Sequence, residues 1–223
     1  MAMENIGGIA FLHCAMAYHD NGDIETALQL ITEAVIKFPD EGKLSLYLGR
    51  ILIEKEKMDD GIDCILRAVA LDRELAEDGA DILARRAREA SQMADYPLAE
   101  RLYRFSHGFA PQALWHKVYL GETLETMGHE DEAVAIYQEI LQAAPESPYT
   151  AEKLDYLFLR HENPEGRRLF WRELHEQYPE AALPILRLGK ALIEGDDYGA
   201  SRQLLEALLA REPNNIEAAF LLA

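Results

Sequence analysis

The chain has 223 residues, of which 49% are hydrophobic and 28% charged, so it can bury one large core or two small ones and is not a disordered protein. Forty acidic against 22 basic residues give a formal charge of −18, which disfavours nucleic acid and anionic membranes as partners. Two cysteines allow no disulfide framework, and no signal peptide or membrane-inserting segment is indicated, so we expect a cytoplasmic protein.

The prolines reveal an internal repeat. Pro111, Pro145, Pro179 and Pro213 follow one another at a constant interval of about 34 residues. Pro39 lies slightly more than two such intervals before Pro111, which fits one further unit ending at Arg73 and one lengthened by four residues near "AEDG" (76–79). The predicted units cover residues 8–41, 42–75, 80–113, 114–147, 148–181 and 182–215, with a partial unit at 216–223.

Each unit reads as a helical hairpin. First helices carry an apolar stripe with a small residue inside it, as in "CAMAY" (14–18), "LGRIL" (48–52), "LGETL" (120–124) and "LGKAL" (188–192). Turn signals follow in "NGD" (21–23), "MGHED" (127–131) and "EGDD" (194–197), where glycine is expected to end the helix. Second helices repeat the spacing of Ala133, Tyr137, Ile140 and Pro145, although the fifth unit has Arg167 at the small position.

This pattern of Leu-Gly, Ala, aromatic and closing Pro, with a period of about 34 residues, resembles the tetratricopeptide repeat family. Arg86 at the usual leucine position and Asp155 in place of the glycine depart from it and put local helix packing in question. The resemblance implies an all-α fold: a right-handed superhelical solenoid of about six hairpins plus a C-terminal half-repeat helix, forming a single domain over residues 1–223.

Catalytic chemistry is not indicated. The sequence contains no nucleotide loop, paired catalytic carboxylates, zinc spacing or nucleophile motif, so we expect no enzyme activity, no cofactor and no metal site. The histidines are interpreted as structural or solvated, and Cys14 and Cys64 as packing residues. The basic patch "RRAR" (85–88) fits either a solvated, ion-paired face or a reader of anionic groups.

The family resemblance implies a non-catalytic scaffold that binds an unidentified protein or peptide in a concave groove lined by first helices. An alternative is an interaction module of a larger polypeptide, such as a transferase, with its active site elsewhere. Trp115 and Tyr149 fit either ligand anchors or packing between hairpins. The predicted groove residues are Lys43, Leu46, Arg50, Asp81, Arg88, Trp115, Val118, Glu122, Tyr149, Tyr156, Leu183, Leu186 and Lys190.

Some members of that family hold acidic chaperone tails with a clamp of lysines, asparagines and an arginine. Met16, Arg50 and Arg88 stand where asparagines would be required, so a chaperone-adaptor role is not supported.

The last residues, "PNNIEAAFLLA", begin a seventh unit without a second helix. Phe220, Leu221 and Leu222 are too apolar for a polar capping helix. They predict self-association or continuation into a longer protein, unless the half-helix lies on the sixth hairpin as a lid.

Overall fold

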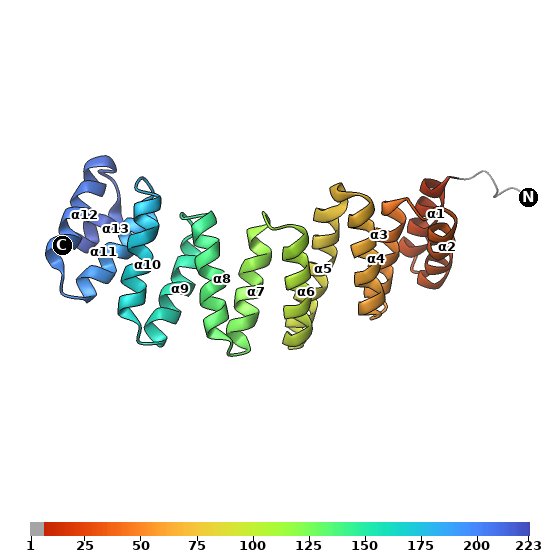
Figure 1. Cartoon of the computed structure of the whole chain (residues 1–223), viewed down its shortest axis with the longest axis horizontal. Helices are drawn as coiled ribbons and strands as arrows, with labels where there is room; N and C mark the ends of the chain where they lie inside the picture. Colours follow the sequence, from red (N-terminus) through yellow and green to blue (C-terminus); the bar gives the residue numbers. More distant parts are fainter. Residues whose placement is uncertain (1–6) are drawn as a thin grey trace, which may run out of the picture. The chain divides into compact units, whose positions relative to one another are not determined.

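The computed structural model of the chain describes residues 7–223 and contains, within that range, thirteen α-helices, one 3₁₀ helix and no strand (Figure 1). Residues 1–6, which the domain prediction includes, lie outside the described range. The predicted all-α fold of repeated helical hairpins is confirmed. In chain order the elements are α1 (Gly8–Asp20), α2 (Ile24–Lys37), α3 (Gly42–Glu54), α4 (Met58–Leu71), η1 (Arg73–Leu75), α5 (Ala76–Gln92), α6 (Tyr96–Phe109), α7 (Leu114–Thr126), α8 (Glu130–Ala143), α9 (Pro148–Arg160), α10 (Pro164–Gln177), α11 (Ala182–Glu194), α12 (Tyr198–Arg211) and α13 (Ile216–Leu222).

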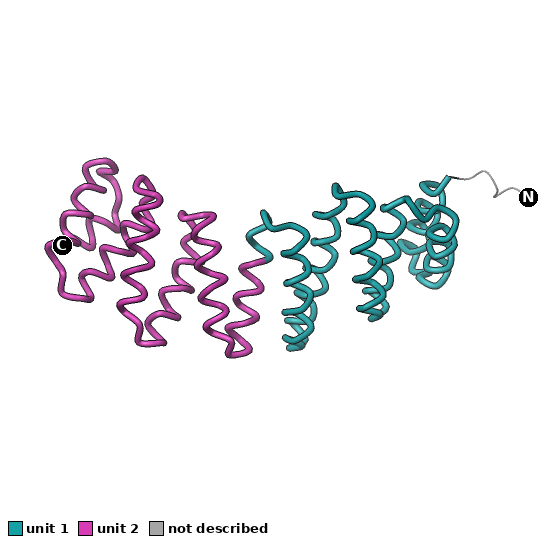
Figure 2. Tube along the Cα trace, in the orientation of Figure 1, with its two compact units in different colours: residues 1–116 teal, residues 117–223 magenta. Residues whose placement is uncertain are grey.

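Two compact units make up the chain, Met1–His116 and Lys117–Ala223, drawn in teal and magenta in Figure 2. The first unit holds the hairpins α1/α2, α3/α4 and α5/α6, and its core includes Phe11, Ile31 and Ile51. The second unit holds most of α7 and all later helices, and a core around Leu186 and Leu205 joins α11 to α12. A single domain over the whole chain stays a prediction.

The repeated prolines mark the ends of the second helices. Five of these helices stop two residues before the proline, because the ring of proline disfavours the helical conformation of the residue that precedes it. Arg73 takes the equivalent place after α4, where the chain continues into η1 rather than into an extended turn. The helix ends are α2 at Lys37, α6 at Phe109, α8 at Ala143, α10 at Gln177 and α12 at Arg211.

Each hairpin turn contains one residue in the left-handed backbone region, at the same repeat position. Gly22 and Gly128 occupy it with φ of 82° and 80°, as predicted, because glycine adopts this conformation without a steric penalty. In "EGDD" the residue with positive φ is Asp196, at 59°, whereas Gly195 has a φ of −98°. Gly195 directly follows the end of α11, as expected, but the left-handed residue is the next one: the repeat register selects the position, regardless of residue type.

The four residues that lengthen the distance between Pro39 and Pro111, residues 76–79, are helical. Residues 76–79 form the first turn of α5, which has 17 residues where α3 and α11 each have 13. Gly79 lies in this added turn, and a Cβ atom there would stand 2.8 Å from the side chain of Ile65 on α4. The glycine thus lets the longer helix approach its neighbour.

An internal ion pair explains why the fifth hairpin, α9/α10, departs from the repeat pattern. Asp155 replaces the usual glycine and Arg167 the usual small residue, and both side chains are buried. The Arg167 guanidinium donates to Asp155 over 2.6 Å and also pairs with Glu194. The indole nitrogen of Trp171 donates to the same Asp155 oxygen over 2.8 Å. The two departures from the repeat pattern therefore compensate each other, and this pairing accounts for the local helix packing at Asp155.

We expect Asp155→Gly to lower the free energy of unfolding by about 3 kcal/mol or more, because it leaves the buried Arg167 without its main partner. The double variant Asp155→Gly, Arg167→Ala should lose less than the sum of the two single losses, because the small-residue contact of the repeat is restored. Urea unfolding of the full chain measures both. Glu206→Ala, which breaks the exposed pair with Arg202, is the control and should leave stability nearly unchanged. Additive single losses would contradict this account.

Candidate functional site

The predicted groove residues all lie on first helices, α3, α5, α7, α9 and α11. Ten of the thirteen side chains are exposed or partly exposed. The other three, Leu46, Leu183 and Leu186, are buried, and Leu186 belongs to the core between α11 and α12. Packing is thus the evident role of Leu183 and Leu186, and their contact with a ligand stays a prediction.

In the first unit, four of the predicted residues meet in one pocket of about 330 Å³. Its walls come from α1, α3 and α5, three successive first helices, and from η1. We call this cavity the first-unit pocket; it is lined by Leu12, Met16, Lys43, Leu46, Tyr47, Arg50, Leu75, Asp78, Asp81, Ile82 and Arg85.

The cations of the first-unit pocket differ in their pairing. Arg50 donates to Glu54 over 3.1 Å and lies 5.9 Å from the centre of the Tyr47 ring. Lys43 and Arg85 form no hydrogen bond or ion pair with any residue that the structure describes. The pocket therefore combines an apolar floor with two unpaired cations, Lys43 and Arg85, and with the carboxylates of Asp78 and Asp81.

Trp115, at the start of α7, remains accessible. Its side chain is 40% exposed, with the Arg88 guanidinium 5.9 Å from the ring centre and His116 at its edge. The Trp115 side chain is thus neither packed in a core nor fully exposed. The role of Trp115 as a ligand anchor stays a prediction.

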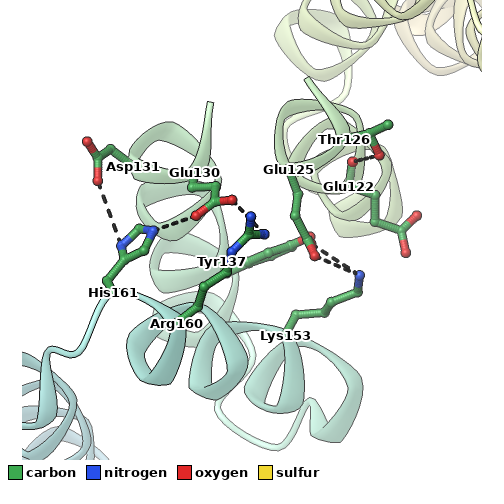
Figure 3. Close-up of polar contacts among 9 residues, drawn as sticks. All are labelled: Glu122, Glu125, Thr126, Glu130, Asp131, Tyr137, Lys153, Arg160 and His161. Carbon is green, nitrogen blue, oxygen red and sulfur yellow. Dashed lines mark hydrogen bonds and ion pairs between the residues drawn. The ribbon is translucent and has the colours of Figure 1, made fainter. Parts of the chain in front are cut away.

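The second unit has a pocket of about 390 Å³ between α7 and α9, lined by Glu125, Tyr149, Glu152, Lys153 and Tyr156. We call it the acidic pocket. Figure 3 shows Lys153 reaching from α9 toward Glu125, 3.1 Å away, while the Tyr137 hydroxyl donates to the same carboxylate over 3.1 Å. Burial, with the Glu125 charge beside it, raises the pKa of Tyr137 far above its usual range.

A second group of charges in Figure 3 joins α8 to the end of α9. Glu130 accepts from Arg160 and from the His161 ring, each over 2.7 Å, and Asp131 lies 3.9 Å from the other ring nitrogen. Because these partners satisfy one another across the hairpin junction, this cluster stabilises the stacking of α8 and α9.

A Ser-His-Asp set occurs in the first unit, but its serine and histidine are enclosed. Ser106 and His116 are fully buried, with 2.8 Å between the hydroxyl and Nδ1, and Asp81 lies 3.6 Å from Nε2. The Ser106 hydroxyl donates to the carbonyl oxygen of Ala80 over 2.8 Å, so its proton is already engaged. Burial lowers the pKa of His116 below 6.5, with Asp81 opposing the effect.

Among residues 7–223, no three His, Cys, Asp or Glu side chains are grouped so that they could hold a metal ion. None of the helices in that range is long and apolar enough to cross a membrane.

Several pocket residues were absent from the predicted groove set although the repeat could have found them. Leu12 and Met16 stand one repeat length before Leu46 and Arg50, and Glu152 stands one repeat length after Val118. Extending each predicted groove position to the equivalent position in every repeat would have identified Leu12, Met16 and Glu152. Lys153 and Arg85 do not occupy the predicted groove positions, and only the packing of adjacent first helices shows that they face a pocket.

Sequence profiles described as tetratricopeptide repeat match residues 15–76, 118–147 and 185–215, together more than half of the chain. The chain belongs to the tetratricopeptide repeat family. No curated protein sequence matches this tetratricopeptide repeat protein significantly.

Solved structures resemble it at low identity. MamA is 14% identical over 83% of this chain and 96% of its own, with a TM-score of 0.44. PilF from Pseudomonas aeruginosa is 14% identical over 95% of both chains, with a TM-score of 0.40. A tetratricopeptide repeat protein from Parabacteroides merdae is 14% identical over 91% of this chain and 79% of its own, with a TM-score of 0.47. At these values the likenesses carry no functional argument.

The enclosed histidine predicts a pH dependence of stability. Since the folded chain disfavours protonated His116, the unfolded chain binds its proton first as the pH falls below 6.5. His116 therefore supports the fold fully above that pH and progressively less below it, with a slope of at most about 1.4 kcal/mol per pH unit for one proton. His116→Asn should flatten the difference between pH 7.5 and pH 5, as measured by urea unfolding. The exposed His13→Asn is the control; equal pH profiles for wild type and His116→Asn would contradict the assignment.

Proposed function

We propose that this protein is a non-catalytic scaffold that binds a peptide or protein segment on its first-helix faces. Tetratricopeptide repeats are in general interaction modules, which supports the coarser part of the proposal. The observation that carries the finer part is the first-unit pocket, which three successive first helices line together. A ligand that crosses such a surface contacts several repeats at once.

The chemistry of the first-unit pocket suits a polypeptide. Leu12, Met16 and Ile82 offer an apolar surface, while Lys43 and Arg85 offer charge at the same cavity. Pockets that fix a ligand commonly combine a mainly apolar lining with a few polar groups that set its orientation. A segment with an apolar anchor next to an acidic residue would satisfy both features.

A non-catalytic role agrees with the environment of the reactive residue types. Ser106 and His116 are enclosed, and the cysteines Cys14 and Cys64 are both free. Burial raises the pKa of the Cys64 thiol, which makes it less reactive. We propose the cytoplasm as the location, because reduced cysteines persist there.

The first test uses peptides selected from a random display library on the full chain. Trp115→Ala should weaken binding of a selected peptide about tenfold, because truncating an aromatic anchor costs on the order of 1–2 kcal/mol. Isothermal titration measures the affinity, and circular dichroism checks the fold. Tyr198→Ala, which removes an exposed aromatic residue from the second helix α12, should leave affinity unchanged. Failure to select any peptide would contradict the scaffold.

We also propose self-association through α13. Leu221 and Leu222 pack partly against the last hairpin, but Phe220 remains 78% exposed. An aromatic ring this exposed gains by being buried against another surface, such as a second copy of the chain.

Phe220→Glu tests this proposal, because Phe220, unlike Leu221, does not pack against the core of the last hairpin. Light scattering over a concentration series should show wild type increasing in mean mass, whereas Phe220→Glu should remain monomeric. Ile36→Glu, at an exposed position on α2, should behave as wild type. A wild type that stays monomeric at every concentration would refute the association.

A further inference from the structure

The acidic pocket differs from the first-unit pocket in the sign of its charge. Glu125 and Glu152 line it, and Glu122 lies at its edge, where it accepts a hydrogen bond from the Tyr149 hydroxyl. Lys153 is the one cation among the five lining residues. After this lysine is counted, the three carboxylates leave the site with an excess of negative charge.

The three carboxylates are not equally engaged. Glu125 is held by Lys153 and by the Tyr137 hydroxyl, and Glu122 by Tyr149. Glu152, in contrast, has no hydrogen bond or ion pair with any described residue. Its charge is therefore available to a group that enters the pocket.

Two tyrosine rings flank these charges. Tyr149 is 49% and Tyr156 52% exposed, so both rings are accessible to a ligand. The bond to Glu122 fixes the Tyr149 ring, so little freedom remains to be lost when a ligand stacks on it. That bond, together with burial and the charges of Glu122 and Glu125, raises the pKa of Tyr149 to about 12. The Tyr149 ring thus lies beside two carboxylates.

We propose that the acidic pocket binds a cationic side chain of the partner, arginine in preference to lysine; this rests on the proposed scaffold function. A guanidinium can stack on a tyrosine face and present two N–H groups to one carboxylate, whereas an ammonium offers only a point charge. A cavity of about 390 Å³ has room for a long side chain and the backbone that carries it. An anionic segment would meet Glu122, Glu125 and Glu152 and be repelled.

Lys153 acts as an internal competitor in this arrangement. It occupies the Glu125 carboxylate when the pocket is empty, and an entering guanidinium must share or displace it. Removing the lysine should consequently improve binding of a cation, which a purely structural role for this ion pair would not produce.

The test is an NMR titration of the ¹⁵N-labelled full chain with Nα-acetyl-arginine methylamide at low salt, beside its uncharged citrulline analogue. We expect shifts of the amides of residues 149–156 with arginine and much smaller ones with citrulline. Glu152→Gln and Tyr156→Ala should each raise Kd at least fivefold, whereas Lys153→Gln should lower it at least twofold. Glu173→Gln, an exposed carboxylate on the second helix α10, should leave Kd unchanged.

Equal binding of arginine and citrulline, or a Kd that Glu152→Gln leaves within twofold of wild type, would overturn the inference. So would failure of Lys153→Gln to tighten binding. The inference is distinguishable from the scaffold proposal, because selected peptides that bind in a Trp115-dependent way would uphold the scaffold even if no cation enters this pocket. Conversely, arginine binding that meets these criteria would stand even if the Trp115→Ala test failed.

Discussion

The close approach of the two helices within each hairpin is the contact on which the rest of the fold depends. A Cβ atom at Gly49 would lie 2.8 Å from the carbonyl oxygen of Gly61, and one at Gly121 would lie 2.6 Å from the Tyr137 ring. Ala15 and Ala87 take the same repeat position in the first and third hairpins and are fully buried. Because no larger apolar side chain fits there, the helices pack at nearly backbone distance and direct their remaining faces toward the next hairpin.

The fifth hairpin shows that a different kind of interaction can join the two helices. Asp155 and Arg167 occupy both small positions, and their bond, with Trp171 as a further donor, replaces van der Waals contact by a buried polar network, in which the Arg167 Nη2 atom has no hydrogen-bond partner among the described residues. Such a network requires all its members, since an unpaired buried charge is strongly destabilising. The hairpin keeps its place in the array through electrostatic rather than steric complementarity.

The repeated scaffold leaves the first-helix faces free to vary, and the two units use them differently. In one unit Lys43 and Arg85 are unpaired among the described residues beside an apolar floor, while in the other Glu152 is unpaired beside two tyrosines. These unpaired cations and this unpaired carboxylate are of opposite sign. Each pocket would then select a different feature of a bound polypeptide.

The sequence by itself determined the helical hairpins and their ends, because proline spacing and the apolar period of a helix are local signals. It also located the turns at Gly22 and Gly128, although at Asp196 the register of the repeat overrode the neighbouring glycine. The tertiary structure alone decided that Leu183 is buried while Trp115 is accessible, and that Glu122 holds Tyr149. A period along one helix shows which residues share a face, but exposure and pairing depend on side chains that the adjacent hairpin contributes, as Tyr149 does for Glu122 from 27 residues further along the sequence.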